Sequence, residues 1–258
     1  WKRALVPTGW IRPGYREKLP RVKVPGFVDE GLAAIFGYLL GDGWIDTQGV
    51  GFVIAEGEND LAPKLQDLFG DTFGVRPRSL PRDGKITRFR IYRRPIIRWL
   101  WSLRVKRVPD VIMQSRNSVV STFLRWLYDA DGSCFAGGRG RTSISLRSAE
   151  IELLRDVQVL LLRWGINGRI LWGRPPRPHV HRGAEVRGGQ SGSLVIRQAE
   201  SILRFAGHIG FESAKKQETL SRVVEHAESR SRRWHPRMSE RIVSIRPAGF
   251  ATVYDIEV

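Results

Sequence analysis

The sequence predicts an α+β protein made of two similar halves, on the basis of a repeated motif and of the similar order of elements after each copy. An apolar helical stretch at residues 31–43 ends in Gly-Asp-Gly, and a second one at residues 121–132 ends in Asp-Ala-Asp-Gly. The last Asp of the second copy, Asp131, follows Asp42 by 89 residues, which is the length of a small domain. Each copy is followed by strand-like and helix-like runs in the same order. Each half is therefore expected to be an αββαββα unit.

The first half is expected at residues 26–117, after a basic N-terminal arm at residues 1–25. Four prolines and two glycines in the arm are typical of an extended segment or linker. The half continues from its apolar helix with a β-rich run through residue 55, a helix near 58–70, a strand at 85–94 and a Trp-rich helix near 95–103.

The second half is expected at residues 118–225 and contains the clearest strand of the chain. From residue 139 to 147 every odd position is polar or basic, and Thr142, Ile144 and Leu146 alternate with them. The later elements are a helix at 149–164, strands near 166–173 and 193–197 on either side of a loop at 174–192, and a helix at 198–207. Residues 226–258 form a C-terminal extension that ends in a strand-like run at 251–258.

The composition indicates a polyanionic partner. The chain of 258 residues has 43 basic and 26 acidic residues, for a formal net charge of +17, and eight of the basic residues are Lys. Arg presents a planar fork that suits phosphates and guanine edges, so nucleic acid is the expected partner. No apolar run of membrane-spanning length occurs, so no membrane partner is expected. The single Cys134 excludes an internal disulfide framework and suits a reducing compartment, so we expect a cytoplasmic protein.

The two Asp-Gly helix ends are the strongest candidates for a functional site. Each Gly is expected to stop its helix by adopting a positive φ, and Gly37 and Gly41 provide a small face for close helix packing. If the two helices pack in parallel, Asp42 and Asp131 meet where both helix dipoles are negative. A divalent cation would remove the repulsion, and carboxylate oxygens favour Mg²⁺. A single Asp of this kind is usually an ordinary turn residue, but its repetition favours a functional role.

Residues 35–43 (Ile-Phe-Gly-Tyr-Leu-Leu-Gly-Asp-Gly) and 124–132 (Leu-Arg-Trp-Leu-Tyr-Asp-Ala-Asp-Gly) resemble the two motifs of a single-chain LAGLIDADG homing endonuclease. The resemblance covers about residues 25–220 and is greatest to the intein-associated, dodecapeptide type. Trp126 stands where the family usually has a small residue, with Gly37 as the expected partner for its bulk. The tail at 253–258 is similar to a strand near the end of inteins. Because the chain neither opens on a splice-site Cys or Ser nor closes on His-Asn, splicing by this chain is not expected.

The resemblance implies that each half places a saddle-shaped antiparallel sheet in the DNA major groove. It implies hydrolysis of one phosphodiester per strand of double-stranded DNA by a monomer with Mg²⁺ or Mn²⁺, leaving short 3′ overhangs. The catalytic metal ligands would be Asp42 and Asp131, assisted by the main-chain carbonyls of Gly41 and Ala130.

The resemblance also implies a basic residue near each catalytic Asp. Lys106 precedes an apolar residue and a proline upstream of the second motif, and Lys215 and Lys216 occupy the corresponding place in the second half. We expect Lys106 and Lys216 to act, with Lys215 the close alternative. Their role would be to polarise the attacking water or to hold the charge that develops on the phosphate. The alternative is that these are ordinary surface lysines.

Basic faces of the expected strands are candidates for DNA contact, because a two-stranded ribbon fits the major groove. Arg88, Arg90 and Tyr92 share one face of the strand at 85–94, with Phe89 and Ile91 toward the core. The corresponding face of the second half holds Arg139, Arg141, Ser143, Ser145 and Arg147. Arg174 and Arg177 in the long loop are expected to contact phosphates, and Arg197 is a further DNA-binding candidate. The alternative is an ordinary solvated sheet face.

The sequence thus predicts a site-specific double-strand DNA endonuclease. The main alternative is the same fold used without cleavage, as an RNA maturase or a DNA-binding regulator. A second alternative is a fragment of an intein whose main activity is splicing.

Overall fold

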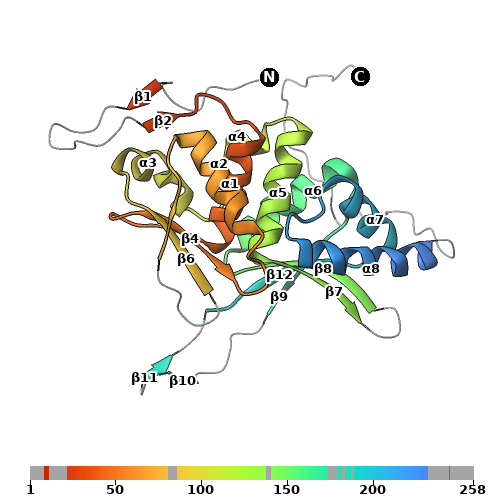
Figure 1. Ribbon diagram of the computed structural model, residues 1–258. Coiled ribbons are helices and arrows are strands. Elements are labelled where there is room, and N and C mark those ends of the chain that lie inside the picture. Colours follow the sequence, from red (N-terminus) through yellow and green to blue (C-terminus); the bar gives the residue numbers. More distant parts are fainter. Residues whose placement is uncertain are drawn as a thin grey trace.

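The computed structural model of the chain describes residues 9–11, 22–80, 86–137, 141–173, 179–181, 184–186, 189–231 and 244. Two antiparallel four-stranded sheets lie side by side, and helices cover the same face of both (Figure 1). Two long helices, α1 (Glu30–Asp42) and α5 (Asn117–Asp131), pack against each other between the halves. This arrangement confirms the predicted α+β fold class with two similar halves.

The first half contains the sheet β3-β4-β6-β5. After α1 the elements are β3 (Gly43–Ile45), β4 (Val50–Ala55), α2 (Leu61–Phe73), β5 (Arg78–Ser79), β6 (Ile86–Ile91), α3 (Arg94–Trp99), a 3₁₀ turn (Trp101–Arg104) and α4 (Asp110–Met113). Asp29 caps α1 by accepting a hydrogen bond from the Leu32 amide at 2.9 Å, which starts the helix one residue before the expected stretch.

The second half repeats this arrangement with the sheet β7-β8-β12-β9. Its elements after α5 are β7 (Gly132–Gly137), β8 (Arg141–Ser148), α6 (Ile151–Leu161), a 3₁₀ turn (Leu162–Trp164), β9 (Arg169–Trp172), β12 (Gly192–Ile196), α7 (Ala199–His208) and α8 (Ala214–Ser231). The sheets correspond strand for strand, because in each the first two strands are followed by a crossover to the opposite edge.

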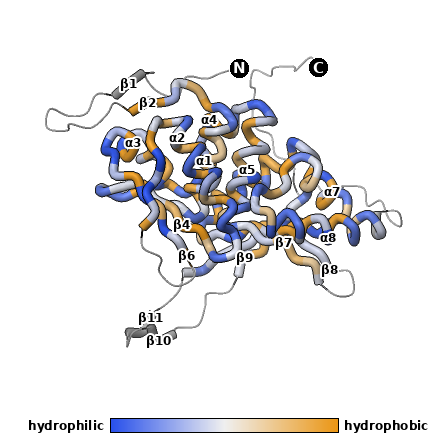
Figure 2. The backbone as a smooth tube through the Cα atoms, viewed as in Figure 1, coloured by the Kyte–Doolittle hydropathy of each residue, from blue (hydrophilic) through white to orange (hydrophobic). Residues whose placement is uncertain are grey.

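The core lies between the sheets and the helices that cover them, where apolar residues concentrate (Figure 2). In the first half Phe52 of β4 stacks on Phe89 of β6 and on Phe69 of α2, with ring centroids 5.1 and 5.8 Å apart. In the second half Ile144 and Leu146 of β8 are fully buried, as the alternation of the sequence predicts. The two cores join through α1 and α5, so the halves share one apolar interior.

Several elements differ from the sequence prediction. The arm is not simply extended, because β1 (Gly9–Ile11) pairs antiparallel with β2 (Val22–Val24), and the Val22 and Val24 side chains are buried. The segment expected to be only a loop contains a hairpin of β10 (His179–His181) and β11 (Ala184–Val186). Helix α8 was not predicted and runs past residue 225, the expected limit of the second half. The strand expected at 251–258 lies outside the described residues.

None of the helices that the structure describes is long and apolar enough to cross a membrane.

Candidate active site at the ends of the two central helices

Helices α1 and α5 run in parallel and approach closely through glycine. A Cβ atom on Gly37 would lie 2.2 Å from the Phe123 carbonyl oxygen, and one on Gly41 would lie 2.4 Å from the Ala130 Cβ. At the opposite end, Glu30 of α1 accepts a hydrogen bond from Ser118 of α5 at 2.8 Å. The C-terminal ends therefore meet, and the Asp131 carboxyl carbon would lie 3.3 Å from a Cβ on Gly41. The expected meeting of Asp42 and Asp131 is what the structure shows.

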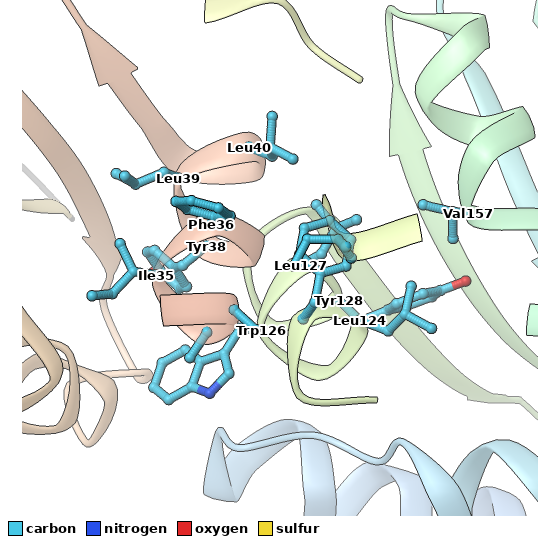
Figure 3. Packing of buried hydrophobic residues seen from close by; sticks show 14 of the residues in the cluster. Ile35, Phe36, Tyr38, Leu39, Leu40, Leu124, Trp126, Leu127, Tyr128 and Val157 are labelled. Atoms are coloured by element: carbon cyan, nitrogen blue, oxygen red, sulfur yellow. The ribbon is translucent and has the colours of Figure 1, made fainter. Parts of the chain in front are cut away.

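The bulky Trp126 packs between α5 and α1. Its ring packs edge-on against Tyr38, with centroids 6.0 Å apart and planes at 77°, and the residue is 5% exposed. Figure 3 shows the indole reaching from α5 toward α1. Gly37 instead faces the backbone of Phe123 and Leu127. The contact that the structure shows for the Trp126 ring is thus with Tyr38, the residue next to Gly37.

The glycines that follow the two aspartates are needed for space and not for a positive φ. Gly43 and Gly132 are extended, with φ of −98° and −89°. A Cβ on Gly43 would lie 2.5 Å from the Leu39 carbonyl oxygen, and one on Gly132 would lie 2.4 Å from that of Tyr128. The strand that leaves each helix folds directly against its last turn, and this proximity leaves no room for a side chain.

The paired carboxyl groups are disfavoured in their charged form. The pKa of Asp42 is raised to about 7, chiefly by burial and next by the Asp131 carboxylate, while the ammonium groups of Lys216 and Lys106 oppose the change. Burial also raises the pKa of Asp131, with Lys106 and then Lys216 opposing. Among the two lysines, the one in the other half therefore lowers the pKa of each carboxyl group most.

This pair of carboxyl groups fits a hard dication. Mg²⁺ is commonly held by one or two carboxylates, with substrate phosphates and water as the other ligands. The main chain of Gly41 and Ala130 lies at the same junction, where carbonyl ligands were expected. No group of three or more His, Cys, Asp or Glu side chains that could hold a metal occurs in the described part of the chain. The donor set for a metal is thus the aspartate pair and its neighbouring carbonyls.

Two lysines bind the ends of the two helices in equivalent ways. Lys106 Nζ donates to the Leu40 carbonyl at 2.6 Å and to that of Leu39 at 3.3 Å. Lys216 Nζ donates to the Asp129 carbonyl and, at 3.5 Å, to that of Tyr128. In both cases the acceptors lie two and three residues before the catalytic candidate Asp.

The structure thus distinguishes between the two lysines at 215 and 216. Lys216 is largely buried and points to the end of α5, whereas Lys215 is exposed. Burial lowers the pKa of Lys106, and the carboxylates of Asp131 and Asp42 counteract this by favouring the ammonium form.

Two acidic residues at the site were not predicted. Asp129 is fully buried and accepts hydrogen bonds from the amides of Glu212 at 2.7 Å and Ser213 at 3.1 Å; burial raises its pKa to about 6. Glu58 forms an ion pair with Lys216 at 3.4 Å, although the two residues belong to different halves. The Asp-Ala-Asp string of the second motif could have indicated Asp129, but no local signal marks Glu58.

The first sheet presents the expected face of Arg88, Arg90 and Tyr92, but Arg90 is paired with an acidic residue of the same half. Phe89 and Ile91 are buried and Arg88 is exposed. Arg90 is held by Asp46, whose carboxylate oxygens accept from its Nη2 at 2.7 and 2.8 Å, and its guanidinium lies 5.2 Å from the Tyr92 ring centroid. Arg90 is therefore fixed in orientation before any ligand binds. Together with Tyr92 it lines an open depression that also contains Arg76, Arg78 and Arg93.

The described residues on the face of the second sheet include both hydroxyl groups and arginines. Ser143, Ser145, Arg147 and Arg197 line one open depression of about 420 Å³. Arg147 donates to the Ser191 hydroxyl at 3.1 and 3.2 Å, and the Ser133 and Ser145 hydroxyls are 2.8 Å apart. The positions predicted at Arg139, Arg174 and Arg177 lie outside the described residues, as does the side chain of Arg141, whose backbone is in β8.

The aspartate pair predicts how stability depends on pH in metal-free protein. Between about pH 4 and 7 the folded chain keeps a proton on Asp42 that the unfolded chain releases, so the free energy of unfolding falls as the pH rises. The loss from this group is expected to be on the order of a few kcal/mol and complete above about pH 7. Chemical denaturation in EDTA at pH 5 and pH 8 measures it.

The variant Asp42→Asn is the control for this measurement, because Asp129 titrates in the same range and remains in both proteins. The variant is expected to be more stable than the natural chain at pH 8 and to show a smaller pH dependence. Equal pH dependence in the two proteins would show that the pKa of Asp42 is not raised in the folded chain.

A family model for LAGLIDADG-like domains matches residues 118–210. Replicative DNA helicase DnaB of Rhodothermus marinus is 29% identical over 263 aligned positions, which cover 89% of this chain and 26% of that protein. Glutamine–fructose-6-phosphate aminotransferase of Methanocaldococcus jannaschii is 23% identical over 211 positions, covering 79% of this chain and 18% of that protein. The chain thus spans about a quarter or less of the length of these relatives.

Two solved structures are similar to this chain. Full-length WhiA from Thermatoga maritima is 17% identical with a TM-score of 0.51, over 83% of this chain and 63% of that chain. The homing endonuclease I-DmoI, solved as mesophilic variants, is 17% identical with a TM-score of 0.47, over 70% of this chain and 89% of that chain. The two antiparallel four-stranded sheets with their helices have the LAGLIDADG fold, and residues 118–210 match the family model of LAGLIDADG-like domains.

Proposed function

We propose that this chain is a site-specific DNA endonuclease that cuts both strands of a long target with Mg²⁺ or Mn²⁺. The observation that carries the proposal is the pair of aspartates at the ends of two parallel helices, each helix end bound by a lysine. A fold used only for DNA binding has no need for two partly buried carboxyl groups that repel each other. Their cost in stability is understandable if a dication and a phosphate complete the site.

The DNA is expected to lie across the sheet faces that the helices leave uncovered. The net charge of +17 favours a polyanion, and a fixed Arg90 on the first sheet suits a guanine edge or a phosphate. The hydroxyl groups of Ser143 and Ser145 on the second sheet can donate to or accept from any base. One chain presents both faces, so a monomer is sufficient for two half-sites.

The chemistry is assigned to the aspartates and the lysines. A bound Mg²⁺ would supply a water of lowered pKa and neutralise the charge that develops on the scissile phosphate. Asp42 and Asp131 would hold the dication against the phosphate, together with the carbonyls of Gly41 and Ala130. Lys106 and Lys216 would orient the attacking water or hold the phosphate oxygens by charge-assisted hydrogen bonds. In this shared centre each aspartate, with a lysine, would serve one strand, which gives a double-strand break with short 3′ overhangs.

The proposal includes carriage of the chain as an insertion in other proteins, as in inteins. The relatives are named for different activities, a DNA helicase and an aminotransferase, and the similarity covers a minor part of each. A shared inserted segment accounts for this pattern more simply than a shared activity of the whole proteins.

The test is cleavage of a plasmid library that carries a long randomised insert, with Mg²⁺, with Mn²⁺ and with EDTA. We expect linear plasmids in the two metal arms alone, and sequencing of their ends should show one cut per strand with 3′ overhangs. If the chain selects sequences from the library by binding but yields no linear product with either metal, the non-cleaving alternative is correct.

A further inference from the structure

The segment that carries Lys106 is held by a carboxylate of the opposite half. Asp156 of α6 accepts hydrogen bonds from Arg107 Nε at 3.0 Å, Arg107 Nη2 at 2.7 Å and the Val108 amide at 3.2 Å. The Asp156 side chain is 11% exposed, while that of Arg107 is 54% exposed. Because Arg107 and Val108 directly follow Lys106, these three bonds fix the backbone from which the lysine extends.

The segment that carries Lys216 is held in a corresponding way by the first half. Lys64 of α2 donates to the Glu212 carbonyl at 3.0 Å and to its carboxylate at 2.8 Å. Asp60, at the N-terminus of α2, accepts a hydrogen bond from the Ala214 amide at 3.0 Å. Lys216 lies in the first turn of α8, so these contacts fix the start of its helix.

The two sets of contacts join corresponding elements of the two halves. Helices α2 and α6 occupy corresponding places in the two halves (Figure 1). Each of them reaches across to the segment that bears the lysine of the other half. The residues differ, since Asp156 lies in the middle of its helix and Asp60 caps the start of the other. The arrangement is therefore shared by the two halves although the side chains are not.

We infer that each half positions the lysine of the other half, with Asp156 as the positioning residue for Lys106 and with Lys64 as the positioning residue for Lys216. The inference rests on the proposed function, because it concerns how the two lysines reach the scissile phosphates. Its consequence is that each cutting centre is assembled from both halves, so a change in α6 acts on one strand of the target and a change in α2 on the other.

Strand-specific cleavage separates positioning from general stability. A loss of stability slows the cutting of both strands together, whereas a misplaced lysine slows the strand that this lysine serves. The measurement is single-turnover cleavage of a selected target that carries a different label on each strand. The variants Lys106→Met and Lys216→Met first establish which strand depends on which lysine.

We expect Asp156→Asn to slow the Lys106-dependent strand by about tenfold or more, since the amide loses its charge and one acceptor. Lys64→Met should slow the Lys216-dependent strand in the same way. The dissociation constant for DNA should not change in either variant. Glu200→Gln in α7 and Asp67→Asn in α2 are matched controls, because each removes an exposed ion pair in the same half and touches neither lysine segment.

Arg107→Gln provides a second route to the same result, in case Asp156→Asn fails to fold. It removes the two hydrogen bonds that the exposed Arg107 side chain donates to Asp156. Cleavage of the Lys106-dependent strand should therefore become slower, as in Asp156→Asn. Equal slowing of both strands by Asp156→Asn and by Arg107→Gln would overturn the inference while the lysine assignment stands. Normal cutting of both strands by Lys106→Met and Lys216→Met would overturn the lysine assignment itself, and the inference with it.

Discussion

Asp42→Asn and Asp131→Asn will each abolish double-strand cleavage, with a loss on the order of a thousandfold or more in rate. Asn keeps the shape of the side chain but removes the charge that would hold a dication at the paired helix ends. The dissociation constant for the target should change little, because the sheet faces that would contact DNA are unaltered. Cleavage by the two variants is measured beside electrophoretic titration of their binding.

The expected stability of these variants excludes unfolding as the cause of the lost cleavage. Removing one of two repelling carboxylates should leave the metal-free variants at least as stable as the natural chain at pH 8, so unfolding cannot explain a loss of activity. Asp67→Asn is the matched control, since Asp67 forms an exposed ion pair with Arg76 on the surface of α2. Cleavage by Asp131→Asn at the normal rate with Mg²⁺ would refute the assigned mechanism.

Gly37→Ala is expected to lower the free energy of unfolding by about 2–3 kcal/mol, although Ala favours a helix more than Gly does. The new Cβ would lie 2.2 Å from the Phe123 carbonyl oxygen and 3.0 Å from the Leu127 amide nitrogen, and both are backbone atoms of α5. The two helices can relieve this overlap only by moving apart. Because the ends of these helices carry Asp42 and Asp131, moving them apart should lower the rate of cleavage as well as the free energy of unfolding. Chemical denaturation and the cleavage assay measure the two effects.

Gly207→Ala is the matched control for this substitution. Gly207 also lies inside a helix, but a Cβ placed there meets no atom within 4 Å. Its replacement should leave the chain unchanged or stabilise it by up to about 1 kcal/mol, because Ala loses less backbone entropy on folding. If Gly37→Ala also changes stability by less than about 0.5 kcal/mol, the close approach of α1 and α5 is not as described.

Local patterns were sufficient to predict the elements that carry the site. The alternation around Ile144 reflects one buried face of a strand, and the unbroken apolar run at 32–40 reflects a helix buried on all sides. The meeting of Asp42 and Asp131 was also predictable, because the same motif occurs twice and Gly37 and Gly41 indicate close helix packing. The helix α8 was missed, since its sequence is strongly polar and its apolar face consists of a few residues, Leu220, Val223 and Ala227.

Other features of the site depend on which distant segments come into contact, and a local sequence pattern does not indicate such contacts. The choice of Lys216 over Lys215 depends on the direction in which the first turn of α8 faces α5. The explanation first expected for Gly43 was wrong because a close approach and a positive φ both select glycine, and only the coordinates separate them.

By itself, the sequence determined that the chain has two α+β halves, a strongly basic surface and a repeated apolar helix that ends in Asp-Gly. These properties follow from periodicity, composition and repetition, which can be read along the chain. Only the tertiary structure decided that Glu58 pairs with Lys216 and that Asp156 holds the segment after Lys106. The physical reason is that these are contacts between single polar groups about 50 or more residues apart, and one ion pair or hydrogen bond imposes no pattern on the residues around it.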